Sequence, residues 1–185
     1  LGSAAAGIRL RVEGREHFSD PRPAVYVFNH QSAIDPLLLC RLMRAPFAWL
    51  VPGRPGISPA FRRLAAPVET VYVEPSAGQA GLEPALRRLR AGVSLVAAHA
   101  GGGPKPRFES LDAAPLQVAA AARVPLIAIA LHNAQVALPT NSLIIRKSTV
   151  DVAVLSPIAT AKWKRTERAR HVEALRELYL EVLHT

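Results

Sequence analysis

Apolar runs alternate with polar, glycine-containing and proline-containing segments along the 185-residue chain. Short runs rich in β-branched and aromatic residues predict strands at residues 24–28, 47–51, 68–73, 93–98 and 124–131. Apolar residues at helical spacing predict helices at residues 35–44, 58–64, 81–91, 113–122 and 166–183. Near the end of the chain, residues 143–145 and 149–155 predict a β-pair.

The alternation of strands and helices predicts the fold class. Strands that are apolar throughout are typical of a parallel sheet whose two faces are both buried. Helices between such strands cover those faces. We therefore expect one α/β domain, residues 1–185, with a largely parallel central sheet and helices on both sides.

The charge balance favours anionic partners. The net charge is +9, the pI is about 10.8, and half of the residues are hydrophobic, which excludes a disordered chain. Residues 161–170 combine Trp163 with several lysines and arginines. This segment is either an anchor for an anionic membrane surface or a solvated helix start. We expect no nucleic acid partner, because no nucleic-acid motif accompanies the charge.

Cysteine content and hydropathy bear on the compartment. Cys40 is the one cysteine, so an internal disulfide is impossible and a reducing compartment is expected. The most apolar stretch, residues 124–145, contains too many polar residues for a good bilayer span. The chain begins without Met, which suggests a piece of a longer protein. We expect a cytoplasmic protein associated with the membrane, peripherally or through a segment outside this chain.

The stretch "NHQSAIDP" lies where a predicted strand gives way to a predicted helix. We call this junction between strand and helix the seam. In α/β sheets, ligand-binding and active sites form at such junctions, at the carboxyl ends of the strands. In one interpretation, Ser32 and Asp35 form a capping box, or Asp35 caps the helix, and His30 is a turn residue. In the other, His30 accepts a hydroxyl proton while Asp35 orients the ring and steadies the imidazolium. Spacing leaves both interpretations open.

The segment "NHQSAIDPLLL" closely resembles the first motif, N-H-x-x-x-x-D, of the glycerophospholipid acyltransferases. Later segments are similar to family landmarks in the same order: "VYVEPSAG", "SLVAAHAGGG", "VPLIAIAL" and "STVDVAVLSPI". The resemblance spans roughly residues 8–183. It implies that His30 is the general base and Asp35 its orienting partner. It also implies acyl transfer from acyl-CoA or acyl carrier protein to a lysophospholipid-like acceptor, without a cofactor.

Two positions depart from the family pattern. Pro75 stands where the second motif has a phosphate-binding arginine, and His99 stands where the third motif has a glutamate. The resemblance makes His99 and Gly101 candidates for substrate binding, and glycines also fit a plain turn. A metal site of His30, Asp35 and His99 is a further alternative, although no spacing demands it.

Three cations are candidates for the missing arginine: Lys105, Arg107 and Arg54, each of which also fits a solvated loop. Because the second and third motifs depart from the family pattern at Pro75 and His99, a second function is an open alternative. In that alternative, the chain is a catalytically weakened domain that binds lipid or an acyl chain as a module of a larger protein.

Overall fold

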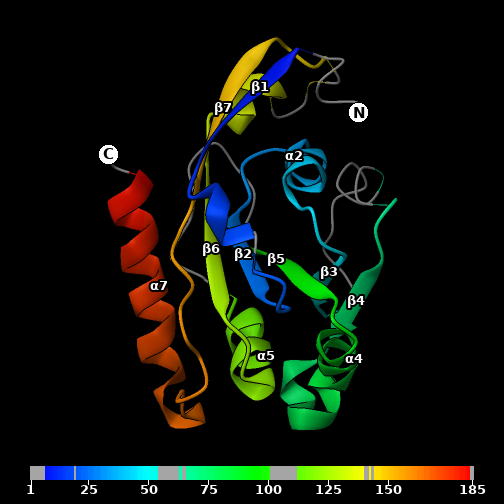
Figure 1. Cartoon of the computed structure of the whole chain (residues 1–185), viewed down its shortest axis with the longest axis vertical. Coiled ribbons are helices and arrows are strands. Elements are labelled where there is room, and N and C mark those ends of the chain that lie inside the picture. The colour runs from blue at the N-terminus through cyan, green and yellow to red at the C-terminus, as the bar shows by residue number, and fades with distance from the viewer. Residues whose placement is uncertain are drawn as a thin grey trace.

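The computed structural model describes residues 7–18, 20–53, 63, 66–100, 112–139, 142 and 144–183. Seven strands form one sheet in the order β1-β7-β6-β2-β5-β3-β4 (Figure 1). The pair β6–β7 is antiparallel and the other neighbouring pairs are parallel. The predicted α/β fold with a largely parallel sheet is therefore confirmed. The strands are β1 (Ile8–Glu13), β2 (Val25–Asn29), β3 (Phe47–Pro52), β4 (Thr70–Val73), β5 (Ser94–Ala100), β6 (Leu126–His132) and β7 (Ser148–Val154).

Helices connect the strands and cover the sheet. The α-helices are α2 (Asp35–Leu42), α4 (Gly78–Arg90), α5 (Ala114–Ala122), α6 (Ala134–Ala137) and α7 (Arg168–Leu183). Three short 3-10 helices are η1 (Arg15–Phe18), η2 (Pro75–Ala77) and η3 (Arg165–Glu167).

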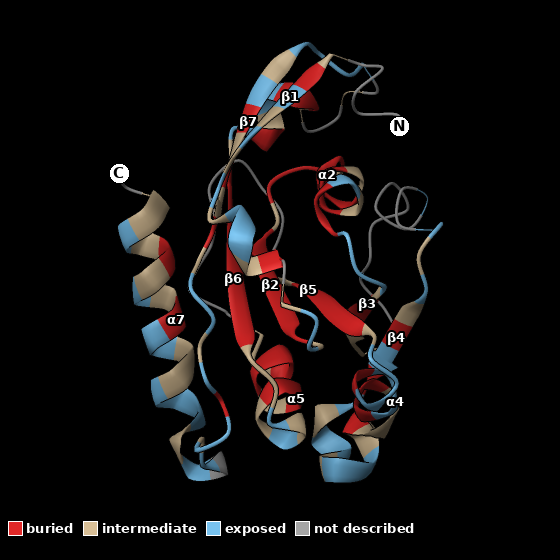
Figure 2. Ribbon diagram, in the orientation of Figure 1, coloured by how far each residue is buried: buried red, intermediate tan, exposed pale blue. Residues whose placement is uncertain are grey.

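The core forms two apolar layers, one on each face of the sheet. In β2, Val25 and Val27 point to the layer that α4, α5 and α7 complete, whereas Tyr26 and Phe28 point to the layer of α2 and α6. All five residues of β2 are buried, and the central strands are buried along most of their length (Figure 2). Strands buried on both faces explain why their sequences read as continuous apolar runs.

The last helix is anchored to the sheet through Tyr179. This side chain is fully buried, and its hydroxyl donates a hydrogen bond to the carbonyl oxygen of Val27 at 2.7 Å. Burial raises the pKa of Tyr179 above its ordinary value. The hydroxyl therefore remains a donor, and α7 stays fixed against the central strand.

Two of the predictions for elements were wrong, and a third is not tested. The strand β1 was not expected, although Ile8, Leu10 and Val12 alternate with polar residues in "IRLRVE". The predicted pairing of residues 143–145 with residues 149–155 is wrong, because β7 pairs with β1 and β6 and residues 144–147 form no strand. The predicted helix at 58–64 lies outside the described residues, apart from Arg63.

Candidate active site

The site begins where β2 leaves the sheet. Its backbone pairing with β6 ends at Phe28 and Ile129, and the side chain of the next residue, Asn29, then bonds to the backbone of Leu131. This side-chain pairing holds β2 against β6 while the backbone turns toward α2. His30 follows at the carboxyl end of the strand, where sites of parallel sheets form.

His30 and Asp35 are in direct contact. Nδ1 of His30 lies 2.8 Å from Oδ2 of Asp35, within hydrogen-bond distance. The Asp35 carboxylate is fully buried, and its Oδ2 also accepts the backbone N–H groups of Gln31 at 2.7 Å and Ser32 at 3.0 Å. Two backbone donors and the imidazole converge on one oxygen, which holds the carboxylate in place and lets it fix the orientation of the imidazole.

The turn forms only part of the predicted cap: the N-cap residue of α2 is Ile34, which makes no side-chain cap hydrogen bond, so the prediction that Asp35 caps the helix is wrong. The Ser32 N–H donates to the Asp35 carboxylate, as in one half of a capping box. The other half is absent, because the Asp35 N–H donates to the backbone carbonyl oxygen of Ser32 at 3.0 Å, and the Ser32 hydroxyl donates to the carbonyl oxygen of Leu138 at 2.6 Å. Helix α2 begins at Asp35 with Pro36 in its first turn. The Asp35 carboxylate therefore binds the backbone of the turn and also contacts the histidine ring.

The imidazole of His30 is partly accessible. Its side chain is 19% exposed, and the ring meets the edge of Phe28 at a centroid distance of 6.2 Å and an interplanar angle of 90°. A neutral ring that donates from Nδ1 to the carboxylate carries its lone pair on Nε2. In that tautomer, Nε2 is the atom that can accept a proton from a substrate hydroxyl.

A register shift in β5 brings His99 to the same edge of the sheet. Phe28 pairs with Ala98 and Asn29 pairs with Ala100, so His99 is an extra residue in β5. Such bulges re-aim the backbone and occur beside active sites. The His99 backbone therefore lies next to the end of β2, whereas its side chain lies outside the described part of the structure.

The second-motif position is held by close backbone packing. Pro75 opens η2, directly after β4 and Glu74. The N–H of Glu74 donates to the carbonyl oxygen of Gly81, and a Cβ at Gly81 would stand 1.8 Å from the Glu74 carbonyl oxygen. The start of α4 therefore requires glycine at this position.

The remaining candidates are not placed. Arg54, Gly101, Lys105 and Arg107 lie outside the described residues. No cluster of three or more His, Cys, Asp or Glu side chains suited to a metal ion occurs among the residues that the structure describes. The alternative metal site would need the side chain of His99, so it is not tested.

Comparison with protein families decides the assignment. A family model described as Acyltransferase matches residues 9–132 of this chain. The chain belongs to the acyltransferase family. The matched region contains the His30–Asp35 pair, β1 from its second residue, the strands β2 to β6 and the helices between them.

A solved acyltransferase has the same fold. The structure is the crystal structure of the 1-acyl-sn-glycerophosphate (LPA) acyltransferase, PlsC, from Thermotoga maritima. Its TM-score is 0.70 at 19% sequence identity, over 98% of this acyltransferase chain and 75% of the PlsC chain. No curated protein sequence matches the chain.

Two residues of the site went unnoticed in the sequence. Asn29 holds β2 to β6, and Gln31 accepts the Ala134 N–H through its Oε1 at 3.1 Å. Both are buried polar residues at or just beyond the end of a strand that is otherwise apolar, and burial of such groups calls for hydrogen-bond partners. That signal was present, but the partners lie about a hundred positions away in the sequence, where no local spacing reveals them.

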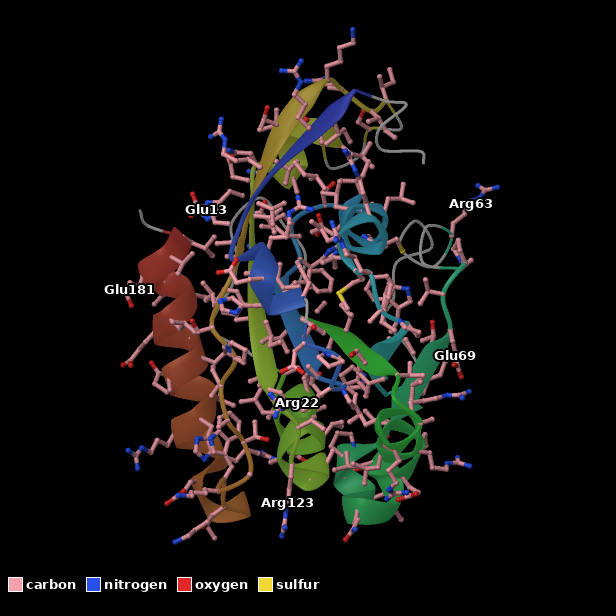
Figure 3. All side chains as sticks on the ribbon, viewed as in Figure 1. Glu13, Arg22, Arg63, Glu69, Arg123 and Glu181 are labelled. Atoms are coloured by element: carbon pink, nitrogen blue, oxygen red, sulfur yellow. The ribbon has the colours of Figure 1, made fainter. Side chains whose placement is uncertain are left out.

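The predicted membrane segment, residues 161–170, lies at the other end of the sheet. Ile158 bridges to Leu126 at the start of β6, and the Thr160 hydroxyl donates to the carbonyl oxygen of Ala119. Trp163 stacks on His171 with ring centroids 4.0 Å apart. Figure 3 shows Arg123 at the lower end of α5, near this segment.

Trp163 also lines a groove between α4, α5 and the start of α7, with a volume of about 480 Å³. Neither His30 nor Asp35 belongs to this groove. None of the helices among the described residues combines the length and the apolarity needed to cross a bilayer.

Proposed function

We propose that residues 1–185 form an acyltransferase domain that moves a fatty acyl group from a thioester donor to a hydroxyl of a lysophospholipid-like acceptor. The observation that carries the proposal is the 2.8 Å contact between His30 and the fully buried Asp35. A histidine oriented by a carboxylate is the arrangement that general-base catalysis uses to activate a hydroxyl. Membership of the acyltransferase family supports acyl transfer as the reaction.

His30 acts on the acceptor in the first step. Nε2 takes the hydroxyl proton while the acceptor oxygen forms a bond to the thioester carbonyl carbon, and the carbonyl oxygen becomes an oxyanion. The resulting imidazolium donates from Nδ1 to Asp35, whose negative charge stabilises it.

The tetrahedral intermediate then collapses. The carbon–sulfur bond breaks, the carbonyl re-forms, and the imidazolium returns the proton to the leaving thiolate. The products are an ester and a free thiol, so His30 ends each cycle neutral. The thiol belongs to coenzyme A or to the prosthetic group of an acyl carrier protein, which are the two donors that we propose.

Recognition of the acceptor relies on residues other than the usual arginine. Pro75 offers no charge at the second-motif position. We assign the acceptor headgroup to the cations Arg54, Lys105 and Arg107, and the remaining acceptor contacts to His99 and Gly101. A charge-assisted bond to phosphate is among the strong hydrogen bonds, so acceptors that keep this contact should be preferred.

The acceptor is a lipid, so the domain works at a membrane. We propose a cytoplasmic, membrane-associated protein that is held peripherally or by a segment outside this chain. The net charge of +9 supports attraction to an anionic membrane surface.

The test is an acyl-transfer assay on the purified protein. Acyl-CoA and acyl carrier protein thioesters are offered with a panel of lysophospholipids, and both thiol release and diacyl product are measured. We expect transfer to at least one acceptor, with lysophosphatidic acid a poor one unless a nearby cation substitutes for the arginine. Lipid binding without transfer across the panel would favour the alternative, a catalytically weakened lipid-binding module.

A further inference from the structure

Apolar side chains are exposed together at the end of the molecule that holds His30. Among the described residues, the exposed large hydrophobics are Tyr72, Val136, Ile144 and Ile145. Val136 is 50% exposed and Ile144 73% exposed. The Arg146 N–H donates to the carbonyl oxygen of Ala137 at 2.8 Å, which places α6 beside residues 144–147. Three of the four exposed hydrophobics are therefore neighbours.

Two cations complete this surface. Arg146 and Lys147 follow the exposed isoleucines directly, and both are exposed. The ion pairs found among the described residues include neither of them. We call the five residues the α6–β7 patch: Val136, Ile144, Ile145, Arg146 and Lys147. Apolar side chains flanked by lysine and arginine suit the boundary between acyl chains and anionic headgroups.

The patch is joined to the turn that carries the dyad. The Ala134 N–H of α6 donates to Gln31 Oε1 at 3.1 Å, and the Ser32 hydroxyl donates to the carbonyl oxygen of Leu138 at 2.6 Å. The backbone N–H groups of Gln31 and Ser32 are the two that bind the Asp35 carboxylate. A lipid surface that contacts α6 therefore lies close to the end of the sheet where His30 stands.

We propose that the α6–β7 patch docks the protein onto an anionic lipid bilayer and presents the His30 end of the sheet to its lipid acceptor. The occupant is a bilayer because apolar and cationic groups adjoin each other on the patch and because the proposed acceptor is itself a lipid. The link to the acceptor rests on the proposed function, whereas docking is measurable without turnover.

The basic segment at residues 161–170 would dock the protein the other way round. Shortly before this segment, Ile158 bridges to the start of β6, whereas α6 comes just after the end of β6. The seven residues of β6 span about 20 Å between these two ends. Figure 1 shows β1 and β7 at the top of the view and the start of α7 at the bottom. A bilayer bound at Lys162 and Lys164 would leave His30 facing away from it, so the two surfaces are alternatives.

Vesicle flotation distinguishes the two surfaces. Phosphatidylcholine vesicles with and without phosphatidylglycerol are mixed with the full chain, with R146Q/K147Q, and with the matched control K162Q/K164Q, which has the same net charge. We expect R146Q/K147Q to bind anionic vesicles about 30-fold more weakly, since each cation near the surface contributes a factor of about five. The control should retain most of the binding.

A second pair of variants tests the apolar part of the patch. Ile144→Ser should weaken vesicle binding by about tenfold, the order expected for one buried isoleucine. The matched control is Tyr72→Ser, which removes an exposed hydrophobic residue from β4. Equal binding of Ile144→Ser and the wild-type chain would contradict insertion of the patch.

The outcomes separate this proposal from the proposed function. Absence of vesicle binding by the wild-type chain, or loss of binding in K162Q/K164Q alone, overturns the docking proposal. Turnover of a short-chain, monomeric lysolipid is then measured on the same variants. If turnover persists while substitutions in the patch leave vesicle binding unchanged, the proposed enzymatic function is supported and the docking surface is rejected. If substitutions in the patch weaken vesicle binding and no variant shows turnover, docking is supported and the enzymatic function is rejected.

Discussion

The side-chain amide of Asn29 forms hydrogen bonds with both backbone groups of Leu131. Its Nδ2 donates to the Leu131 carbonyl oxygen at 2.9 Å, and its Oδ1 accepts the Leu131 N–H at 2.7 Å. One amide group thus continues the pairing of β2 with β6 after the backbone ladder has stopped at Phe28. The backbone is then free to turn, and His30 projects from the edge of the sheet without separating the strands.

This relationship makes Asn29 a structural residue of the site. Asn29→Ala would leave the buried N–H and C=O of Leu131 without partners, which costs about 1–3 kcal/mol for each group. We expect urea unfolding to show a loss of about 2–5 kcal/mol in the free energy of unfolding. Asn29→Asp keeps an acceptor and should also be destabilising, because no donor reaches the Leu131 carbonyl oxygen. An Asn29→Ala variant as stable as the wild-type chain would show that the pairing is dispensable.

Asp35→Asn tests the charge of the dyad apart from its shape. The amide oxygen can still accept from Gln31 and Ser32, but the negative charge beside His30 is lost. We expect the transfer rate to fall by about 100-fold or more, because the imidazolium is no longer stabilised. Thermal unfolding should show that the Asp35→Asn variant still folds.

The matched control for this variant is Asp20→Asn. Asp20 is a partly exposed carboxylate, and its hydrogen bonds with Arg22 lower its pKa to about 2, so the same charge is removed at neutral pH. Its rate should equal that of the wild-type chain. Equal losses in the two variants would refute a specific role for the Asp35 charge.

Cys40 should take no part in the chemistry. Burial raises the pKa of its thiol above the ordinary value, so the thiolate fraction at neutral pH is lower than that of a free cysteine. Iodoacetamide should therefore modify Cys40 more slowly than it modifies glutathione at the same pH. Cys40→Ala should retain the transfer rate; an inactive but folded Cys40→Ala variant would point to an acyl-cysteine intermediate instead.

Tyr179→Phe should lower the free energy of unfolding by about 1 kcal/mol, because it removes the buried hydrogen bond to Val27. Tyr179→Ala also leaves a cavity beneath α7 and should cost about 3–5 kcal/mol. Tyr72 is 43% exposed, so Tyr72→Phe serves as the control and should change stability little. Chemical denaturation of the three variants provides the comparison.

Sequence reasoning worked where local patterns determine structure. The apolar runs of β2, β5 and β6 identified a parallel sheet because both faces of these strands are buried. The seam at His30 and Asp35 was identified from the change of period and from the family motif. Contact between the two side chains depends on the geometry of the turn between them. A spacing of five residues does not specify that geometry.

Reasoning from the sequence failed where partners are remote. The apolar run at residues 143–145 was mistaken for a strand, whereas Ile144 and Ile145 are exposed and form no strand. The strand β1 was overlooked because its alternating pattern is short and belongs to an edge strand. The acceptor candidates Arg54, Gly101, Lys105 and Arg107 lie outside the described residues and remain predictions.

The central claim is that His30 is the general base of acyl transfer. The most direct measurement is the initial rate of thiol release from an acyl thioester, with the best acceptor of the lysolipid panel, for the wild-type chain, His30→Ala and the control His17→Ala. His17 lies in η1, before the loop that leads to β2, and its Nε2 is 3.9 Å from Oε1 of Glu16. We predict a fall of about 100-fold or more for His30→Ala, with unchanged thermal stability, and no fall for His17→Ala. A folded His30→Ala variant that releases thiol at the wild-type rate would contradict the account.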